Sequence, residues 1–209
     1  MIYLSDDYLN KYCDTLSYLL GRSYEEGYSF DYIEKTIAYS SPINELEKSD
    51  VTSIAFSPME VTYNNIFPSH ENNYKFDPYD NFGWIGYTYM HLFLSLEITF
   101  EALFYIVPLK EMMGLYHLYH EMDYNQTLDF VKDLKRNSVL DVIMKRKNYS
   151  CKTLSDVTGV PVSTVNALRY GYRDIGKLEV DKLYLLSQKL HIKMETLLPS
   201  LHLDKQKNN

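Results

Sequence analysis

Histidines near the middle of the chain have a type and a spacing that could bind a metal ion. His117 and His120 lie three residues apart, Glu121 follows directly, and His91 belongs to the preceding predicted helix. On a helix this spacing places both imidazoles on one face, as zinc binding requires. Tyr and Leu residues are interleaved with them, which is typical of histidines that face solvent or are satisfied within a core. We therefore predict no metal ion and no cofactor.

Two glutamates could form a carboxylate pair. Glu97 and Glu101 are four residues apart in an apolar segment, the spacing that acid–base catalysis on one helix face would need. A tyrosine hydroxyl or Lys110 as a core partner explains these carboxylates at least as well. Cys13 and Cys151 have no neighbouring signal of a nucleophile, and the sequence contains no phosphate loop, glycine-rich nucleotide motif or serine elbow. The sequence therefore does not predict an enzyme.

The stretch from residue 150 to residue 171 predicts two short helices joined by a tight turn. Gly159 provides the positive φ that such a turn requires, and Val160 fills the angle between the helices. The residues expected to face inward are Leu154, Val157, Val165 and Leu168. The residues expected to face outward from the second helix are Val162, Ser163, Thr164, Asn166, Arg169 and Tyr170. This pattern is a helix-turn-helix, which presents its second helix to a DNA major groove.

The same residues are similar to those of the lambda-repressor/Cro class, also called the Xre-type helix-turn-helix family. The shared features are a leucine in the first helix, the turn Thr158-Gly159-Val160, the core Ser163-Thr164-Val165, the closing Gly171 with the basic Arg173, and a later helix over residues 183–190. The resemblance spans residues 138–199 and implies a lambda-repressor-like domain of five helices. Ser155, Arg169 and Tyr170 depart from the family pattern, and Pro161 precedes the second helix. The family's base preference therefore does not transfer to this chain.

The resemblance implies roles for individual side chains. Val162, Ser163 and Thr164 would lie at the end of the reading helix nearest the base edges, where hydroxyls bond bases and methyl groups contact thymine. Asn166, one turn later, would read adenine or bind a phosphate. The residues expected to meet phosphates are Lys152, Arg169, Tyr172, Arg173 and Lys177. Phosphate contacts supply affinity without sequence information, so we expect modest specificity.

Hydrophobic periodicity predicts a mainly all-α fold. The helices expected before residue 125 cover residues 5–20, with Gly21 as a stop, then residues 30–37, 43–48, 81–96, 99–106 and a last helix after Pro108. Loops with short helical turns are expected between residues 50 and 81, with residues 51–56 as the one candidate strand. The helices expected after residue 125 cover residues 127–135, 138–147, 151–158, 161–170, 179–190 and a last turn at 194–198.

Charge divides the chain into two parts. Residues 1–125 contain 6 Lys and Arg against 19 Asp and Glu, whereas residues 126–209 contain 15 against 9. The formal net charge of −7 therefore conceals an acidic part and a basic part, which is typical of a nucleic-acid-binding module joined to an acidic partner domain. We predict an acidic, Tyr-rich domain over residues 1–125, a DNA-binding domain over 126–203, and a polar tail over 204–209.

The acidic domain suggests a protein partner. Residues 83–123 resemble segments of small proteins that accompany toxin genes, chiefly in Trp84-Ile85-Gly86-Tyr87 and in the run from Tyr119 to Asp123. An acidic, Tyr-rich surface suits a cationic partner. We therefore expect a DNA-binding transcriptional regulator, an autoregulating antitoxin, acting as a homodimer on a pseudo-palindromic operator.

Two other function classes remain open at this stage. One is a repressor whose N-terminal domain holds a small molecule, and the other is a toxin enzyme using Glu97, Glu101, His117 and His120. The location is expected to be cytoplasmic, because the N-terminus has no basic region of a signal peptide and the two cysteines fit a reducing compartment. No membrane span is expected either, because the apolar run from Trp84 to Val107 carries charged residues.

Overall fold

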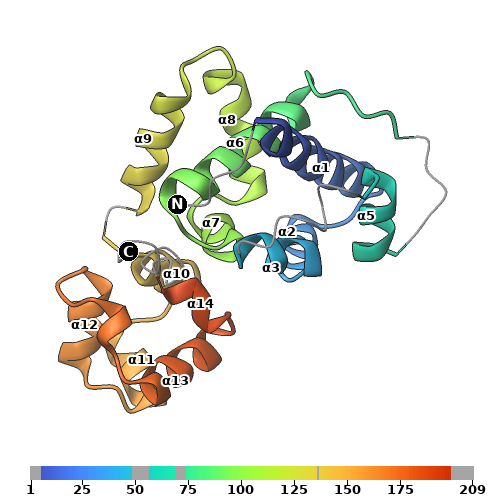
Figure 1. Cartoon of the computed structure of the whole chain (residues 1–209). Helices are drawn as coiled ribbons and strands as arrows, with labels where there is room; N and C mark the ends of the chain where they lie inside the picture. Colours follow the sequence, from blue (N-terminus) through green and yellow to red (C-terminus); the bar gives the residue numbers. More distant parts are fainter. Residues whose placement is uncertain (1–5, 49–56, 69–73, 136, 199–209) are drawn as a thin grey trace, which may run out of the picture.

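The computed structural model describes residues 6–48, 57–68, 74–135 and 137–198, and within these ranges it is mainly helical, without a strand (Figure 1). The helices of the first part are α1 (Asp6–Glu25), α2 (Phe30–Ala38), α3 (Ser41–Glu47), α5 (Met59–Ile66), α6 (Asn81–Leu96), α7 (Phe100–Ile106), α8 (Leu109–Tyr119) and α9 (Tyr124–Lys135). The later ones are α10 (Val139–Arg146), α11 (Cys151–Thr158), α12 (Val162–Arg169), the 3-10 helix η1 (Ile175–Lys177), α13 (Val180–Leu190) and α14 (Met194–Leu197). The predicted all-α fold is confirmed. The candidate strand at residues 51–56 lies outside the described residues.

The first core is built around α1 and α6, which pack against each other along their lengths. Gly86 makes this approach close, because a Cβ on it would lie 2.5 Å from the Ser17 backbone nitrogen. The prediction that Gly21 ends the first helix was wrong, and α1 continues to Glu25. Gly21 instead leaves room for Tyr74, whose hydroxyl would lie 2.1 Å from a Cβ at that position. A glycine that is needed for close packing has the same sequence signal as a helix stop.

The apolar middle of the chain is bent rather than continuous. The Asp80 side chain, one residue before the expected cap, accepts a hydrogen bond from the Gly83 N–H at 2.8 Å and starts α6. Glu97 ends α6 with a left-handed φ of 52°, Thr99 caps α7, and the two helices differ in direction by 108°. No single helix within the described ranges is long and apolar enough to cross a membrane.

The second core is largely distinct from the first, although Val142 of α10 belongs to the first cluster. Its buried residues come from the helices between α10 and α14 and from the loops that join them. Helix α9 packs on the first core instead, with Val131 fully buried and Leu128 and Phe130 against the same cluster. The packing therefore divides the chain between α9 and α10, one helix later than the change of charge at residue 126. We call the two parts the acidic domain (α1–α9) and the basic domain (α10–α14).

Candidate nucleic-acid interface

The turn between α11 and α12 is fixed by its own side chains. Ser150 caps α11 by accepting a hydrogen bond from the Thr153 N–H at 3.0 Å. Gly159 ends the helix with φ at 70°, a value that glycine adopts without strain. Val160 follows, fully buried, and its N–H donates to the Thr158 hydroxyl at 3.3 Å. The two short helices are thus joined by a tight turn that is anchored in the basic domain's core.

The inward faces of the two helices follow the sequence pattern with one exception. Leu154, Val165 and Leu168 are buried in the second core, as expected. Val157 was expected to face inward, but its side chain is 44% exposed. The correction follows from helix geometry, because Val157 is three residues after the buried Leu154 and one before the buried Thr158, at the edge of the apolar stripe.

Most of the predicted site residues are exposed, on α12 itself or on the segments before and after it. The exposed ones are Lys152, Val162, Ser163, Asn166, Tyr170, Tyr172, Arg173 and Lys177, and Thr164 is half-buried. Ser163 and Asn166 are exposed, and their side chains form no hydrogen bond with the described part of the chain. The first two turns of α12 therefore offer hydroxyl, amide and apolar groups on one accessible surface.

Arg169 is the exception among the predicted site residues. The expectation that it faces outward toward phosphate was wrong, because its Nε donates to Asp141 Oδ1 at 2.7 Å. Only 19% of the Arg169 side chain and 3% of the Asp141 side chain are exposed. The guanidinium also donates to the Cys151 sulfur at 3.7 Å. Arg169 thus holds the end of α12 against α10 and α11.

Asp141 is the residue that sequence reasoning missed. Its carboxylate accepts hydrogen bonds from Arg169, from the Asn137 amide at 2.8 Å and from Lys145 at 2.8 Å. Burial opposes the ionised form, but these hydrogen bonds outweigh it, so the pKa of the Asp141 carboxyl lies below its usual value. An acidic residue within the apolar run of α10 was the only sequence signal, and it did not identify the partner.

The segment after α12 is ordered by backbone bonds. Gly171 has φ at 73°, and the Arg173 N–H donates to the Ala167 carbonyl at 3.1 Å. Tyr172 is 85% exposed, and its ring lies 6.2 Å from that of Tyr170. Asp174 caps η1, which carries Lys177. The cations predicted to meet phosphates on this side are therefore on a short, well-defined loop and on the first turn of α11.

The other residues considered for chemistry are not brought together as a catalytic or metal site. His117 and His120 are exposed on and just after α8, and the His120 ring stacks on Tyr116. The His91 ring lies 4.0 Å from the Tyr87 ring in a tilted arrangement, and burial lowers the pKa of its imidazole. Among the described residues, no group of three or more His, Cys, Asp or Glu side chains could hold a metal ion.

The two glutamates are separated by the bend between α6 and α7. Glu97 is exposed at the end of α6, whereas Glu101 is buried. The Tyr39 hydroxyl donates to Glu101 Oε1 at 2.7 Å, and the Lys193 N–H donates to Oε2 at 2.9 Å. The tyrosine partner expected for a core carboxylate is therefore present for Glu101, and Lys110 is not that partner.

Comparison with known proteins adds no assignment, because no family model, no curated protein and no solved structure matches the chain.

Proposed function

We propose that the chain is a cytoplasmic, sequence-specific DNA-binding regulator that reads the major groove with α12. The observation that carries the proposal is the two-sided character of this helix. Its inner side is fixed by Val165, Leu168 and the Arg169–Asp141 pair, while Ser163 and Asn166 face solvent. Rigid support behind exposed hydrogen-bonding groups is what direct base reading requires.

Electrostatics support the same face. Lys152, Arg173 and Lys177 are exposed on segments next to α12. The positive excess of residues 126–209 opposes the acidic excess of the rest of the chain. Lysine and arginine beside a reading helix supply the phosphate contacts that dominate affinity. The acidic domain, which repels nucleic acid, favours approach through the basic domain.

The test is fluorescence anisotropy with the duplex upstream of the chain's own gene and with a random duplex, at several salt concentrations. We expect the upstream duplex to bind more tightly, and this preference to persist as salt rises. The combined change Arg173→Gln and Lys177→Gln removes two phosphate contacts, so the slope of log K against log salt should fall by about 1.8. Lys110→Gln, on α8 of the acidic domain, removes one charge elsewhere and should leave the slope unchanged.

Specificity is tested separately from affinity. Asn166→Ala and Ser163→Ala should reduce the preference for the upstream duplex by about 1–3 kcal/mol for each lost base contact, with little change in binding to random DNA. Arg169 is unsuitable for this purpose, because its replacement would leave Asp141 buried without its partner. Equal, weak binding of both duplexes that vanishes with salt would overturn the proposal.

We further propose that the regulator acts as a homodimer. Val180 and Tyr184, four residues apart on one face of α13, are 70% and 54% exposed. Two such surfaces related by a twofold axis would suit a pseudo-palindromic site. Sedimentation equilibrium should give twice the chain mass, and Tyr184→Glu should give the monomer. A monomer at every concentration would exclude the dimer.

The acidic domain supports an antitoxin role as the finer proposal. It exposes several tyrosines, namely Tyr24, Tyr32, Tyr39, Tyr79 and Tyr87, on a part of the chain with a large acidic excess. Such a surface suits a cationic protein partner. Co-expression with the protein of the neighbouring gene should give a complex that the isolated basic domain does not form. Growth arrest by the chain alone would instead favour a toxin.

A further inference from the structure

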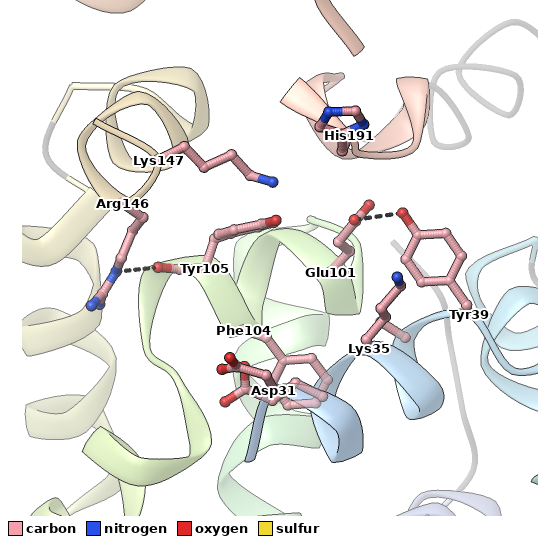
Figure 2. Close-up of a pocket in the computed structure, with 11 residues that line it drawn as sticks. Asp31, Lys35, Tyr39, Glu101, Phe104, Tyr105, Arg146, Lys147 and His191 are labelled. Atoms are coloured by element: carbon pink, nitrogen blue, oxygen red, sulfur yellow. Dashed lines mark hydrogen bonds between the residues drawn. The ribbon is translucent and has the colours of Figure 1, made fainter. Parts of the chain in front are cut away.

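A groove of about 380 Å³ opens between the two domains. Figure 2 shows it with α2 and α7 of the acidic domain on one side and α10 on the other. His191, the left-handed residue that ends α13, also lines the groove. The volume lies at the lower end of the range for pockets that bind small organic molecules.

Several polar groups in this groove are already engaged. Tyr39 and Glu101 bond each other, and Glu101 also accepts from the Lys193 N–H and from the Thr196 hydroxyl at 2.5 Å. Arg146 donates to both oxygens of Glu111 at 2.6 and 2.9 Å and to the Tyr105 carbonyl at 3.0 Å. These groups form the walls that join the domains, and they have little capacity left for a ligand.

Two lysines are among the groups that remain. The Lys35 and Lys147 ammonium groups extend into the groove from α2 and from the end of α10, one from each domain (Figure 2). Neither forms an ion pair with a carboxylate of the described residues at 4.0 Å or less. The Tyr105 hydroxyl likewise has no hydrogen bond to the described residues. Three carboxylates also line the groove: Asp31 is exposed, Glu101 is bonded as described above, and Glu34 accepts a hydrogen bond from the Leu109 N–H at 2.6 Å.

Lys147 is partly desolvated before any ligand binds. Its side chain is half-buried, and its ammonium lies 5.2 Å from the centre of the Tyr105 ring. Burial lowers the pKa of this ammonium, although the charge of Glu101 acts in the opposite direction. An anion beside it would restore the interactions that water provided.

The groove also has an apolar side. Ala38 and Phe104 are buried residues that line it, and the half-buried Tyr105 ring lies beside them. Flat aromatic surfaces of this kind favour a planar group in the ligand. The groove thus joins two cations from different domains to an aromatic wall.

We propose that this groove binds a small aromatic phosphate monoester, whose phosphate lies between Lys35 and Lys147 and whose ring contacts Phe104 and Tyr105. A phosphate monoester carries nearly two negative charges near neutral pH and so matches two ammonium groups. Because the ligand contacts both domains, its binding stabilises their docked arrangement. The proposal concerns binding of the anion alone and stands or falls independently of DNA binding.

The test is isothermal titration of phenyl phosphate into the full chain, without DNA. We expect one ligand per chain, with weaker binding of inorganic phosphate, which lacks the ring, and of benzyl alcohol, which lacks the charge. Lys35→Met with Lys147→Met should weaken phenyl phosphate binding about tenfold or more, because two charge-assisted contacts are lost. Lys75→Met removes an exposed ammonium of the acidic domain far from the groove along the chain and should have no effect.

A second readout separates the ligand site from folding. Phenyl phosphate should raise the thermal unfolding midpoint of the natural chain and of Lys75→Met, but not that of the double variant. Circular dichroism should show that the double variant keeps its helical content. Absence of phenyl phosphate binding, or equal binding by the natural chain and the double variant, would overturn the proposal. Equal binding of inorganic phosphate would exclude the aromatic contact.

Discussion

At the scale of single residues, buried carboxylates carry much of the polar organisation of this chain. Asp141, Glu101 and Glu34 each accept hydrogen bonds from groups that lie far away in the sequence. The Leu109 N–H donates to Glu34 Oε1 at 2.6 Å across 75 residues. Sequence reasoning offered a core partner for Glu101 as one of two explanations but could not identify these partners, because no periodicity connects residues at such separations.

Glu34 makes stability depend on pH. Burial raises the pKa of its carboxyl from 4.5 to about 7, although the Leu109 N–H and Arg146 act in the opposite direction. The folded chain therefore binds more protons than the unfolded chain between these values, and stability falls as pH rises through this window. Glu34→Gln keeps an oxygen for the Leu109 N–H and removes the charge.

We expect Glu34→Gln to increase the free energy of unfolding above pH 7 by about 1–2 kcal/mol, after allowing for partial exposure of the site, and to change it little near pH 4. Urea unfolding at several pH values measures this difference. Glu25→Gln, an exposed change of the same charge on α1, should show no such dependence on pH. A variant that is less stable above pH 7 would contradict the argument.

At the scale of elements, close helix contacts are fixed by glycines. Gly86 on α6 faces the Ser17 backbone on α1, whereas Gly114 on α8 has no neighbouring atom within 4 Å of an added Cβ. The periodicity of α6 predicted its extent well, but it could not distinguish a packing glycine from a tolerated one. The same ambiguity led to the wrong end for α1 at Gly21.

Gly86→Ala and Gly114→Ala should therefore have opposite effects. The first forces α1 and α6 apart and should cost about 1–3 kcal/mol, as overpacking does. The second replaces a flexible residue within an exposed helix and should stabilise the chain by about 0.5–1 kcal/mol. Thermal unfolding measures both, and a neutral Gly86→Ala would show that the two helices do not pack as closely as described.

At the scale of the whole molecule, Lys193 connects the two domains. Its ammonium donates to the Ala38 carbonyl at 2.5 Å and to the Asn44 amide oxygen at 2.6 Å, and it lies 3.6 Å from Glu47. The change of charge along the chain predicted two domains, but not this contact. Charge patterns report composition, whereas docking depends on which side chains meet.

Lys193→Met should loosen the docked arrangement. The lost charge-assisted hydrogen bonds contribute about 1.5–3 kcal/mol each. Water that bonds to the freed acceptors offsets part of this loss. Trp84, the sole tryptophan, lies on α6, so its fluorescence reports on the acidic domain. Circular dichroism reports on the helices of both domains. In the natural chain both signals should change together in urea. In the variant, the circular dichroism signal should begin to change at a lower urea concentration than the Trp84 fluorescence.

The control for this prediction is Lys189→Met, which removes an exposed ammonium of α13 and should leave the two signals coincident. Coincident transitions with an unchanged midpoint in Lys193→Met would show that the domains do not depend on this residue for their docking.

The pairing of Arg146 and Lys193 with the acidic domain has a consequence for how a polyanion meets the molecule. Both cations belong to the basic domain, yet both are directed at carboxylates or carbonyls of α1–α9. Left unpaired, these two cations would attract phosphates to a side of the domain other than the one that α12 exposes. If the chain binds DNA as proposed, the acidic domain competes with nucleic acid for these two cations. Under the proposed function, encounters with DNA through the docked side would be disfavoured, and the exposed cations near α12 would guide the approach.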